Sequence, residues 1–189
     1  VMEHTLRSGL TLLAHAIKRV ADASWTTRDI TLNALSAALV EFIASMPVYR
    51  TYLGNGGERR GDREAVEQAF SWAVRRNASG DLSALLFIRS LMLDPADAVS
   101  DPALRRARKA AVTRLQQYTS GVYAKGVEDT AYYRDNTLLA LNEVGGDPGG
   151  PAGTLPEFHR FNEQRARHWP YALTATSTKQ APWYVIPAD

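Results

Sequence analysis

Cysteine is absent from this sequence of 189 residues, and no apolar run is long. Without cysteine the chain forms no disulfide and uses neither a cysteine nucleophile nor a cysteine-based zinc site. The apolar stretches are far shorter than the ~20 residues of a membrane-spanning helix, and no charged leader with an apolar block and a small-residue cleavage site is visible. We therefore expect an unprocessed, soluble, cytoplasmic protein that does not associate with a membrane.

The excess of positive over negative residues is also small. The net charge is +2, and the sequence pI of about 9.0 reflects that small surplus. An excess of two charges does not by itself indicate nucleic acid. The best candidate for a basic surface is a group of four arginines, Arg105, Arg106, Arg108 and Arg114. They spread around more than one face of a predicted helix, as on a solvated surface, and we expect no nucleic-acid partner.

Motifs that hold metals or phosphates are missing as well. The four histidines show neither His-x-x-x-His nor His-x-x-Glu-His spacing, so metal ligation is not expected. The sequence has no Gly-x-Ser-x-Gly elbow and no phosphate-cradling glycine loop, which removes the simplest support for an α/β-hydrolase or a P-loop enzyme. We expect no cofactor.

What the sequence does contain is helical periodicity. In its first half, apolar residues recur every three or four positions and so share one stripe of each helix. The pattern predicts five helices, over residues 2–20, 28–45, 62–77, 81–92 and 102–118. A shorter helix is expected over 156–168, because Pro156 and Glu157 suit a first turn. Residues 119–156 are predicted to be irregular. The chain is thus predicted to be a mainly α domain, long enough to bury its own core.

Local signals predict where the helices begin and end. Thr26 to Asp29 supply an N-cap candidate for the second helix, which should end before Pro47. Asp62 and Asp101 are expected to begin the third and fifth helices. In the third helix, Trp72 is predicted to face inward together with three alanines, Ala65, Ala69 and Ala73.

Polar and aromatic residues concentrate between Tyr123 and Asp147, which indicates a polar site with aromatic walls rather than a core segment. The candidate site residues of this block are Lys125, Glu128, Asp129, Tyr132, Tyr133, Arg134, Asn142, Glu143 and Asp147.

Four of these candidates are carboxylates that suit glycosidic chemistry, which commonly uses two carboxyl groups about 5–9.5 Å apart. Glu128 with Asp129 and Glu143 with Asp147 furnish such a pair if the two stretches meet. The alternative is a structural ionic network in which Glu128 and Glu143 pair with Lys125 and Arg134.

The run Tyr-Ala-Lys-Gly-Val-Glu-Asp-Thr-Ala-Tyr-Tyr-Arg-Asp-Asn, residues 123–136, resembles a signature block of the maltooligosyltrehalose synthase family. These enzymes are relatives of α-amylase that isomerise the reducing-end linkage of maltodextrins. Three further motifs, at residues 25–53, 114–119 and 157–170, lie before and after this block in the same order as in the family. The resemblance covers about residues 5–178 and rests on several long motifs.

The resemblance implies a helical domain excised from a larger amylase-type barrel enzyme, since a complete barrel takes about 250 residues. It also implies contacts with a maltooligosaccharide, in which Tyr132 and Tyr133 stack on glucose rings while polar neighbours hydrogen-bond to hydroxyls. Those neighbours are Lys125, Glu128, Asp129 and Arg134, and Asn142 is a further substrate-binding candidate.

The chain departs from the family at the catalytic carboxylates. The family's nucleophile and acid/base lie in barrel motifs before the helical region, and nothing before Trp25 resembles either. Its third carboxylate belongs to a His-Asp pair that follows Ala-Thr-Ser-Thr, whereas here residues 175–178 are followed by Lys179 and Gln180. All three catalytic carboxylates are therefore missing from the matched motifs.

The last residues of the chain resemble a different protein family. Residues 175–189 are similar to a segment of family-2 polyphosphate kinases, without the phosphate loop that kinase activity needs. We therefore divide the chain into a synthase-like helical region, 1–178, and an unrelated tail, 179–189.

Three functional interpretations remain. The first is a truncated synthase segment that contacts maltodextrin and lacks the family's activity when isolated. The second is a small hydrolase with a new site at Glu128 and Glu143, assisted by Asp129 and Asp147. The third is a helical interaction module that self-associates as a homo-oligomer, because excision from a barrel exposes surface that packed against it.

Overall fold

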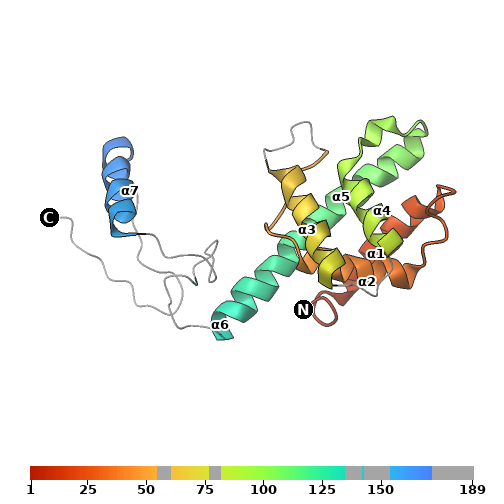
Figure 1. Cartoon of the computed structure of the whole chain (residues 1–189), viewed down its shortest axis with the longest axis horizontal. Helices are drawn as coiled ribbons and strands as arrows, with labels where there is room; N and C mark the ends of the chain where they lie inside the picture. The colour runs from red at the N-terminus through yellow and green to blue at the C-terminus, as the bar shows by residue number, and fades with distance from the viewer. Residues whose placement is uncertain (55–60, 77–81, 135–141, 143–153, 172–189) are drawn as a thin grey trace. The chain divides into compact units, whose positions relative to one another are not determined.

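The computed structural model describes residues 1–54, 61–76, 82–134, 142 and 154–171, and the structural statements below concern these residues. Every regular element among them is helical and none is a strand (Figure 1). The elements are α1 (Arg7–Asp22), α2 (Leu32–Ala44), α3 (Asp62–Arg76), α4 (Leu82–Leu93), the short 3₁₀-helix η1 (Ala96–Ala98), α5 (Pro102–Tyr123), the π-helix η2 (Ala124–Ala131), α6 (Tyr132–Arg134) and α7 (Leu155–His168). The chain divides into two compact units, Val1–Gly126 and Val127–Asp189.

The mainly α fold and all six predicted helices are confirmed. The predicted N-cap of α5 is also confirmed, since Asp101 Oδ1 accepts a hydrogen bond from the Ala103 amide at 2.9 Å. The predicted N-cap of α2 is wrong. Thr31 caps this helix, with its Oγ1 accepting from the Ala34 amide at 3.1 Å. The earlier residues instead form turns closed by backbone hydrogen bonds to Ser24.

The prediction of an irregular segment is wrong for residues 119–134. Helix α5 continues to Tyr123, and η2 and α6 extend the helical path to Arg134. One reason is local, because the Thr119 hydroxyl donates to the Gln116 carbonyl at 2.9 Å and so bonds within the helix instead of interrupting it. The remaining parts of the predicted irregular segment, 135–141 and 143–153, lie outside the described residues.

The core of the first unit lies where α1, α2, α4 and α5 present their apolar stripes. Helix α1 packs on α2 and α5, and α2 also packs on α3 and α4. The largest apolar side chains that are fully buried here are Leu13, Ile17, Leu35, Leu39, Phe42, Leu85, Ile88, Leu91 and Leu115. The inward prediction for Trp72 is wrong, because its side chain is 39% exposed at the edge of the stripe that Ala69 and Ala73 define.

A segment without helical hydrogen bonds, residues 51–53, is fixed to the first unit by side chains. Gln116 on α5 is fully buried, and its Oε1 accepts from the Leu53 amide at 2.7 Å and from the Thr51 hydroxyl at 3.0 Å. Its Nε2 donates to the Leu53 carbonyl at 3.2 Å. Asp62, at the start of α3, accepts from the Tyr52 amide at 3.0 Å. Gln116 thus pairs with a buried backbone as a neighbouring strand would.

Two of the candidate basic residues are engaged with backbone carbonyls. The Arg105 guanidinium donates twice to the Val99 carbonyl, at 3.0 and 2.9 Å, and Arg108 donates to the Ser90 carbonyl at 2.7 Å. These bonds satisfy carbonyl groups at the end of α4 and just before α5. Both arginines therefore stabilise the backbone of the first unit.

Among the residues that the structure describes, no helix is both long and apolar enough to cross a bilayer.

Replacing Gln116 by Ala should destabilise the first unit by about 3 kcal/mol, because the buried amide and carbonyl of Leu53 would lose their partner. Urea denaturation followed by circular dichroism measures the change. Gln117→Ala is the matched control, since this neighbour on the same helix is exposed and should change stability by less than about 0.5 kcal/mol. Equal stability of the two variants would contradict the role given to Gln116.

Candidate functional site

Seven of the nine predicted site residues are described, and six of them follow one another along a continuous helical path. Lys125, Glu128 and Asp129 lie on η2, and Tyr132, Tyr133 and Arg134 form α6. The seventh, Asn142, is buried. Glu143 and Asp147 lie outside the described residues.

The π-helix η2 is the most unusual backbone feature of this region. π-Helices account for well under ~1% of residues in globular proteins and occur frequently at functional sites. Here the π-helix spans eight residues, Ala124–Ala131, and coincides with the polar half of the predicted block. The Lys125 and Asp129 side chains are exposed, and Glu128 is half-buried.

The two adjacent tyrosines of α6 differ in accessibility. Tyr132 is 3% exposed, and its carbonyl oxygen accepts a hydrogen bond from Asn142 Nδ2 at 2.9 Å. Tyr133 is 56% exposed. A sugar ring can stack only on an aromatic face that solvent reaches, so the geometry favours Tyr133 as the stacking residue and gives Tyr132 and Asn142 a supporting position.

The predicted pairing of Glu128 and Asp129 with Glu143 and Asp147 stays a prediction, because Glu143 and Asp147 lie outside the described residues. Glu128 and Asp129 are consecutive on η2, and consecutive side chains of a helix point in different directions. A glycosidase needs two carboxyl groups that face each other across the scissile bond. Glu128 and Asp129 alone do not supply that arrangement.

A second aromatic and basic group lies beside the start of this helical path, in the first unit. The rings of Tyr49 and Tyr123 are 4.1 Å apart, centroid to centroid, and tilted by 33°. The Arg50 guanidinium lies 5.0 Å from the centroid of the Tyr52 ring. Arg50 Nε is buried and has no hydrogen-bond partner in the described part of the chain.

Residues 49–52 lie within the family motif at residues 25–53, and the predicted site does not include them. The signal that could have found them is a pair of tyrosines that flank two polar residues, Tyr49-Arg50-Thr51-Tyr52. Their place next to Tyr123 depends on the long-range pairing of this segment with Gln116, which sequence does not reveal.

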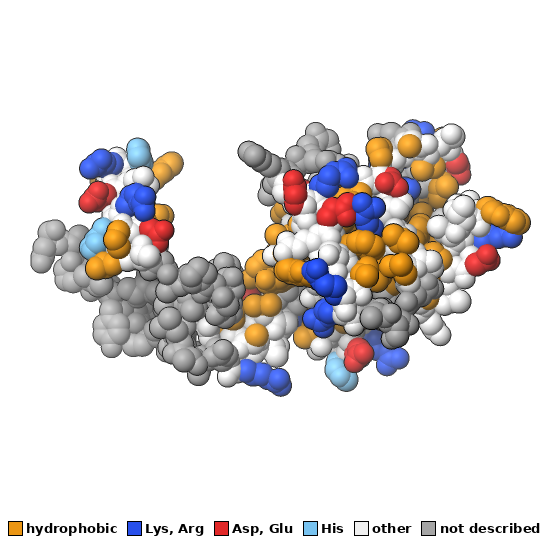
Figure 2. Space-filling view, in the orientation of Figure 1, with side chains coloured by type: hydrophobic (Ala, Val, Ile, Leu, Met, Phe, Trp, Pro, Cys, Tyr) orange, Lys and Arg blue, Asp and Glu red, His pale blue; other side chains and the backbone are white. Residues whose placement is uncertain are grey.

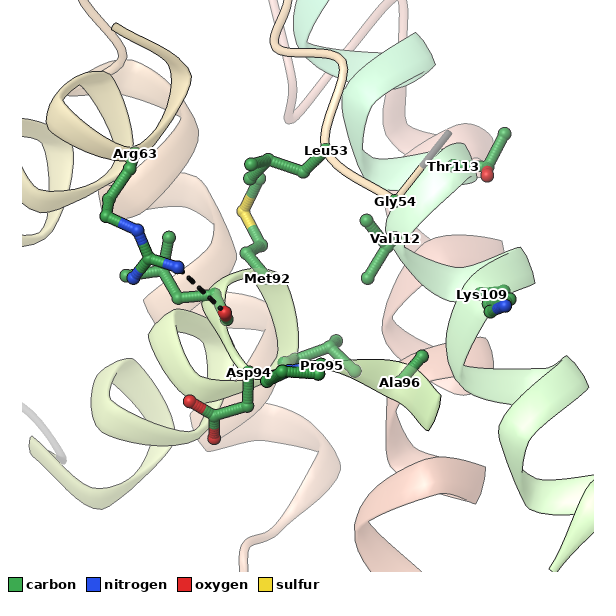
Figure 3. Close-up of a pocket in the computed structure, with 12 residues that line it drawn as sticks. Leu53, Gly54, Arg63, Met92, Asp94, Pro95, Ala96, Lys109, Val112 and Thr113 are labelled. Atoms are coloured by element: carbon green, nitrogen blue, oxygen red, sulfur yellow. Dashed lines mark hydrogen bonds between the residues drawn. The ribbon is translucent and has the colours of Figure 1, made fainter. Parts of the chain in front are cut away.

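A separate cavity of about 200 Å³ lies in the first unit between the end of α4, the middle of α5 and residues Leu53 and Gly54 (Figure 3). Met92 and Val112 form part of its apolar wall, and the Arg63 guanidinium beside it donates to the Leu93 carbonyl at 3.4 Å. None of the predicted site residues lines it, and its described lining includes no aromatic ring. The cavity therefore offers no stacking surface for a sugar.

The residues that the structure describes contain no group of three or more histidine and carboxylate side chains arranged to hold a metal ion.

No protein-family model matches the chain. Two proteins assigned as maltooligosyl trehalose synthase, from two strains of Mycobacterium tuberculosis, are each 47% identical to it over 76 residues. A solved structure of a mutant maltooligosyltrehalose synthase from Arthrobacter ramosus matches with a TM-score of 0.56 and 29% sequence identity.

The chain is similar to a segment of maltooligosyltrehalose synthase. These matches confirm the resemblance that the signature block indicated. They also confirm the prediction that the chain is a helical segment of a larger enzyme. The sequence match covers 40% of this chain and 10% of each relative, and the structural match covers 92% of this chain and 19% of the Arthrobacter synthase. The chain thus spans about a tenth of the curated relatives and a fifth of the solved synthase. The polyphosphate kinase resemblance and the boundary at 178 stay predictions.

Proposed function

We propose that this chain is the helical segment of a cytoplasmic maltooligosyltrehalose synthase that contacts maltodextrin and does not catalyse the family's isomerisation when isolated. The observation that supports the proposal best is the match to the Arthrobacter synthase, which covers 92% of this chain at 29% identity. The chain spans only 19% of that synthase. The maltodextrin substrate and the part that this segment plays in the whole enzyme are therefore part of this proposal.

The contact surface that we propose follows η2 and α6. Tyr133 supplies the exposed ring for stacking on a glucose unit. Lys125 and Arg134, both exposed, supply hydrogen-bond donors for sugar hydroxyls, and Glu128 and Asp129 supply acceptors.

Tyr132 and Asn142 take a supporting role in this proposal, since both side chains are buried and the amide of Asn142 donates to the Tyr132 backbone. They fix the backbone from which the neighbouring Tyr133 projects. Of the two adjacent tyrosines, the exposed Tyr133 is therefore the one whose stacking should be tested.

The proposed lack of activity rests on the missing carboxylates. Glycoside bond rearrangement by this class of enzyme needs a nucleophile and an acid/base. The sequence lacks the family's catalytic residues at the matched motifs. Oriented binding alone does not replace a nucleophile.

Titration of the ¹⁵N-labelled chain with maltopentaose should shift the backbone amide signals of residues 123–134, with a dissociation constant near 1 mM, about −4 kcal/mol. Tyr133→Ala should weaken this binding about tenfold, because the exposed ring would be lost. The control is Tyr171→Ala, which removes a tyrosine that is 99% exposed outside the block. Unchanged affinity in the Tyr133 variant would rule out stacking on this ring, and an absence of shifts in 123–134 would contradict the proposed contact surface.

Incubation of the purified chain with maltopentaose should yield no trehalose-ended isomer, because the nucleophile and the acid/base are absent. Anion-exchange chromatography separates the non-reducing product from the substrate. A full-length synthase in the same assay is the positive control. Isomer formed by the isolated chain would contradict the proposed lack of activity. Glucose or shorter maltooligosaccharides formed by the chain, and lost in a Glu128→Gln variant, would instead support the hydrolase interpretation.

A second candidate function, self-association, is favoured by the surface of α7. This helix has no buried residue, and its apolar stripe is exposed (Figure 2). The stripe consists of Leu155, Phe158, Phe161 and, just after the helix, Trp169, which are 61–70% exposed.

The charges of α7 favour an antiparallel second copy as the occupant of this stripe. Glu157 lies in the first turn, and Arg165 and Arg167 lie in the last. Antiparallel pairing of two copies places the acidic end of each helix beside the basic end of the other. A single helix pair buries little area, so the expected dimer is weak.

Sedimentation equilibrium should detect a dimer that dissociates near 100 μM, about −5 kcal/mol, and weakens as salt is raised. Exchanging both Phe158 and Phe161 for Ser should abolish it, because these rings supply much of the exposed apolar area. Leu12→Ser, at a leucine on α1 that is 61% exposed, is the matched control and should leave association unchanged. A chain that remains monomeric at all concentrations would exclude this function.

A further inference from the structure

The loop between α1 and α2 displays an indole ring that the proposed contact surface does not use. Trp25 is 77% exposed, and the Arg28 guanidinium lies 3.5 Å from the centroid of its ring. At that distance the guanidinium stacks on one face of the indole. The high exposure that remains leaves the opposite face open to solvent.

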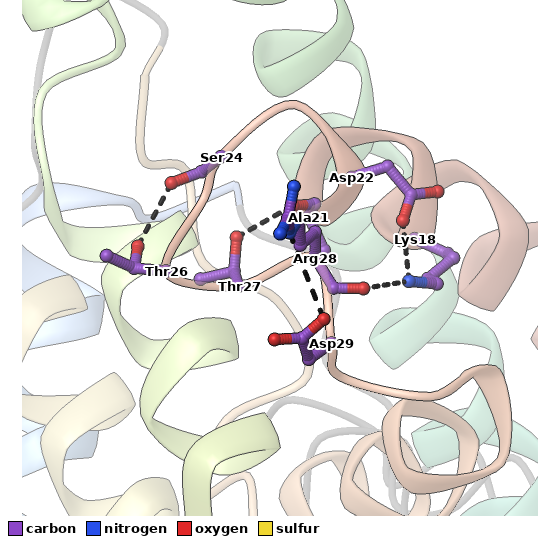
Figure 4. A network of polar contacts seen from close by, with 8 residues as sticks. All are labelled: Lys18, Ala21, Asp22, Ser24, Thr26, Thr27, Arg28 and Asp29. Carbon is purple, nitrogen blue, oxygen red and sulfur yellow. Dashed lines mark hydrogen bonds and ion pairs between the residues drawn. The ribbon is translucent and has the colours of Figure 1, made fainter.

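The loop that presents this ring is held by a network of polar contacts (Figure 4). Lys18 Nζ donates to Asp22 Oδ1 at 2.6 Å and to the Arg28 carbonyl at 2.8 Å, which ties the far side of the loop to α1. The Thr27 hydroxyl donates to the Ala21 carbonyl at 2.8 Å.

The two hydroxyls that flank Trp25 complete this network. Ser24 Oγ and Thr26 Oγ1 lie 3.0 Å apart and form a hydrogen bond. The Arg28 amide donates to the Ser24 carbonyl at 3.0 Å, and Ile30, which is 7% exposed, anchors the end of the loop in the core. A ring presented by so constrained a loop loses little conformational entropy when it binds a ligand.

The charges around the ring balance. Lys18 and Arg28 are positive, and Asp22 and Asp29 are negative. Asp29 is 95% exposed at its side chain, and its Oδ1 lies 3.9 Å from Arg28 Nε. A polyanion such as nucleic acid would meet both carboxylates as well as the cations, so the site favours an uncharged ligand.

The chemistry of the site matches a hydroxylated ring. One open indole face accepts an apolar surface, while the guanidinium and the Asp29 carboxylate supply a donor and an acceptor at its edge. A pyranose has both features, because its axial C–H bonds form an apolar face and its hydroxyls radiate from the rim. A purely apolar ligand would leave the polar groups beside the ring without a role.

We propose that Trp25, Arg28 and Asp29 form a second glucan-binding platform, separate in sequence from the block at 123–134. The choice of an α-1,4-glucan as the ligand rests on the proposed function, whereas the platform itself rests on the geometry of the loop. Such a platform would bind one glucose unit of a maltodextrin against the open face of the indole.

The test is a titration of the ¹⁵N-labelled full chain with maltopentaose, monitored at the indole Nε1–H signals. The Trp25 signal, assigned from its loss in Trp25→Phe, should shift in a saturable manner. The Trp72 indole, 39% exposed on α3, is the internal control and should not shift. Since the ligand is uncharged, the affinity should change little between about 50 and about 500 mM salt.

Two variants locate the contact, with the amides of residues 24–29 as the readout. Trp25→Ala should lower the affinity at this loop about tenfold, and Arg28→Ala roughly threefold, because the ring would lose the cation that orients it. Both side chains are exposed, and circular dichroism checks that the variants keep their helices.

The same titration separates the two proposals. A shift at Trp25 without shifts in residues 123–134 keeps the platform and contradicts the proposed contact surface. Shifts in 123–134 with an unmoved Trp25 indole overturn the platform. It is equally overturned if the Trp25 signal moves with protein concentration in the absence of sugar, which would mark a contact between copies of the chain.

Discussion

The side-chain amide of Gln116 forms the interaction on which the geometry of the first unit depends. It bonds to both backbone groups of Leu53 and to the hydroxyl of Thr51, in a place from which water is excluded. A buried backbone segment outside helices and sheets must find such partners or remain desolvated at a cost. By fixing this segment against α5, Gln116 also determines where the preceding tyrosines lie. The contact between Tyr49 and Tyr123 at the start of the π-helix follows from that placement.

The helices could be predicted from sequence because their cause is periodic. Residues such as Leu13 and Ile17 repeat at helical spacing and are fully buried. The extension of α5 could not be predicted in the same way, since it follows a polar stretch in which Thr119 bonds to its own helix. Gln116 stands beside Gln117 in the sequence, and only tertiary structure makes the first buried and the second exposed.

The candidate site shows the same division between local and tertiary information. The composition of the block between Tyr123 and Asp147 predicted a polar, aromatic surface, and the π-helix lies within it. Sequence treated Tyr132 and Tyr133 as equivalent, although burial separates them. Helix α7 is the opposite case. Its capping box, in which Glu157 accepts from the Thr154 amide and hydroxyl at 2.8 Å, lowers the pKa of Glu157 and defines the helix start without any buried residue.

The π-helix also changes which side chains share one face of its own turns. A π turn holds more residues than an α turn, so each residue of Ala124–Ala131 turns the chain by less than a residue of an α-helix does. Each residue of an α-helix turns the chain by about 100°. Loss of one residue from Ala124–Ala131 that restored α-helical winding would therefore change which polar side chains of η2 lie on the same face. The number of residues in this stretch is thus as important as their identity, because it sets which polar groups lie together.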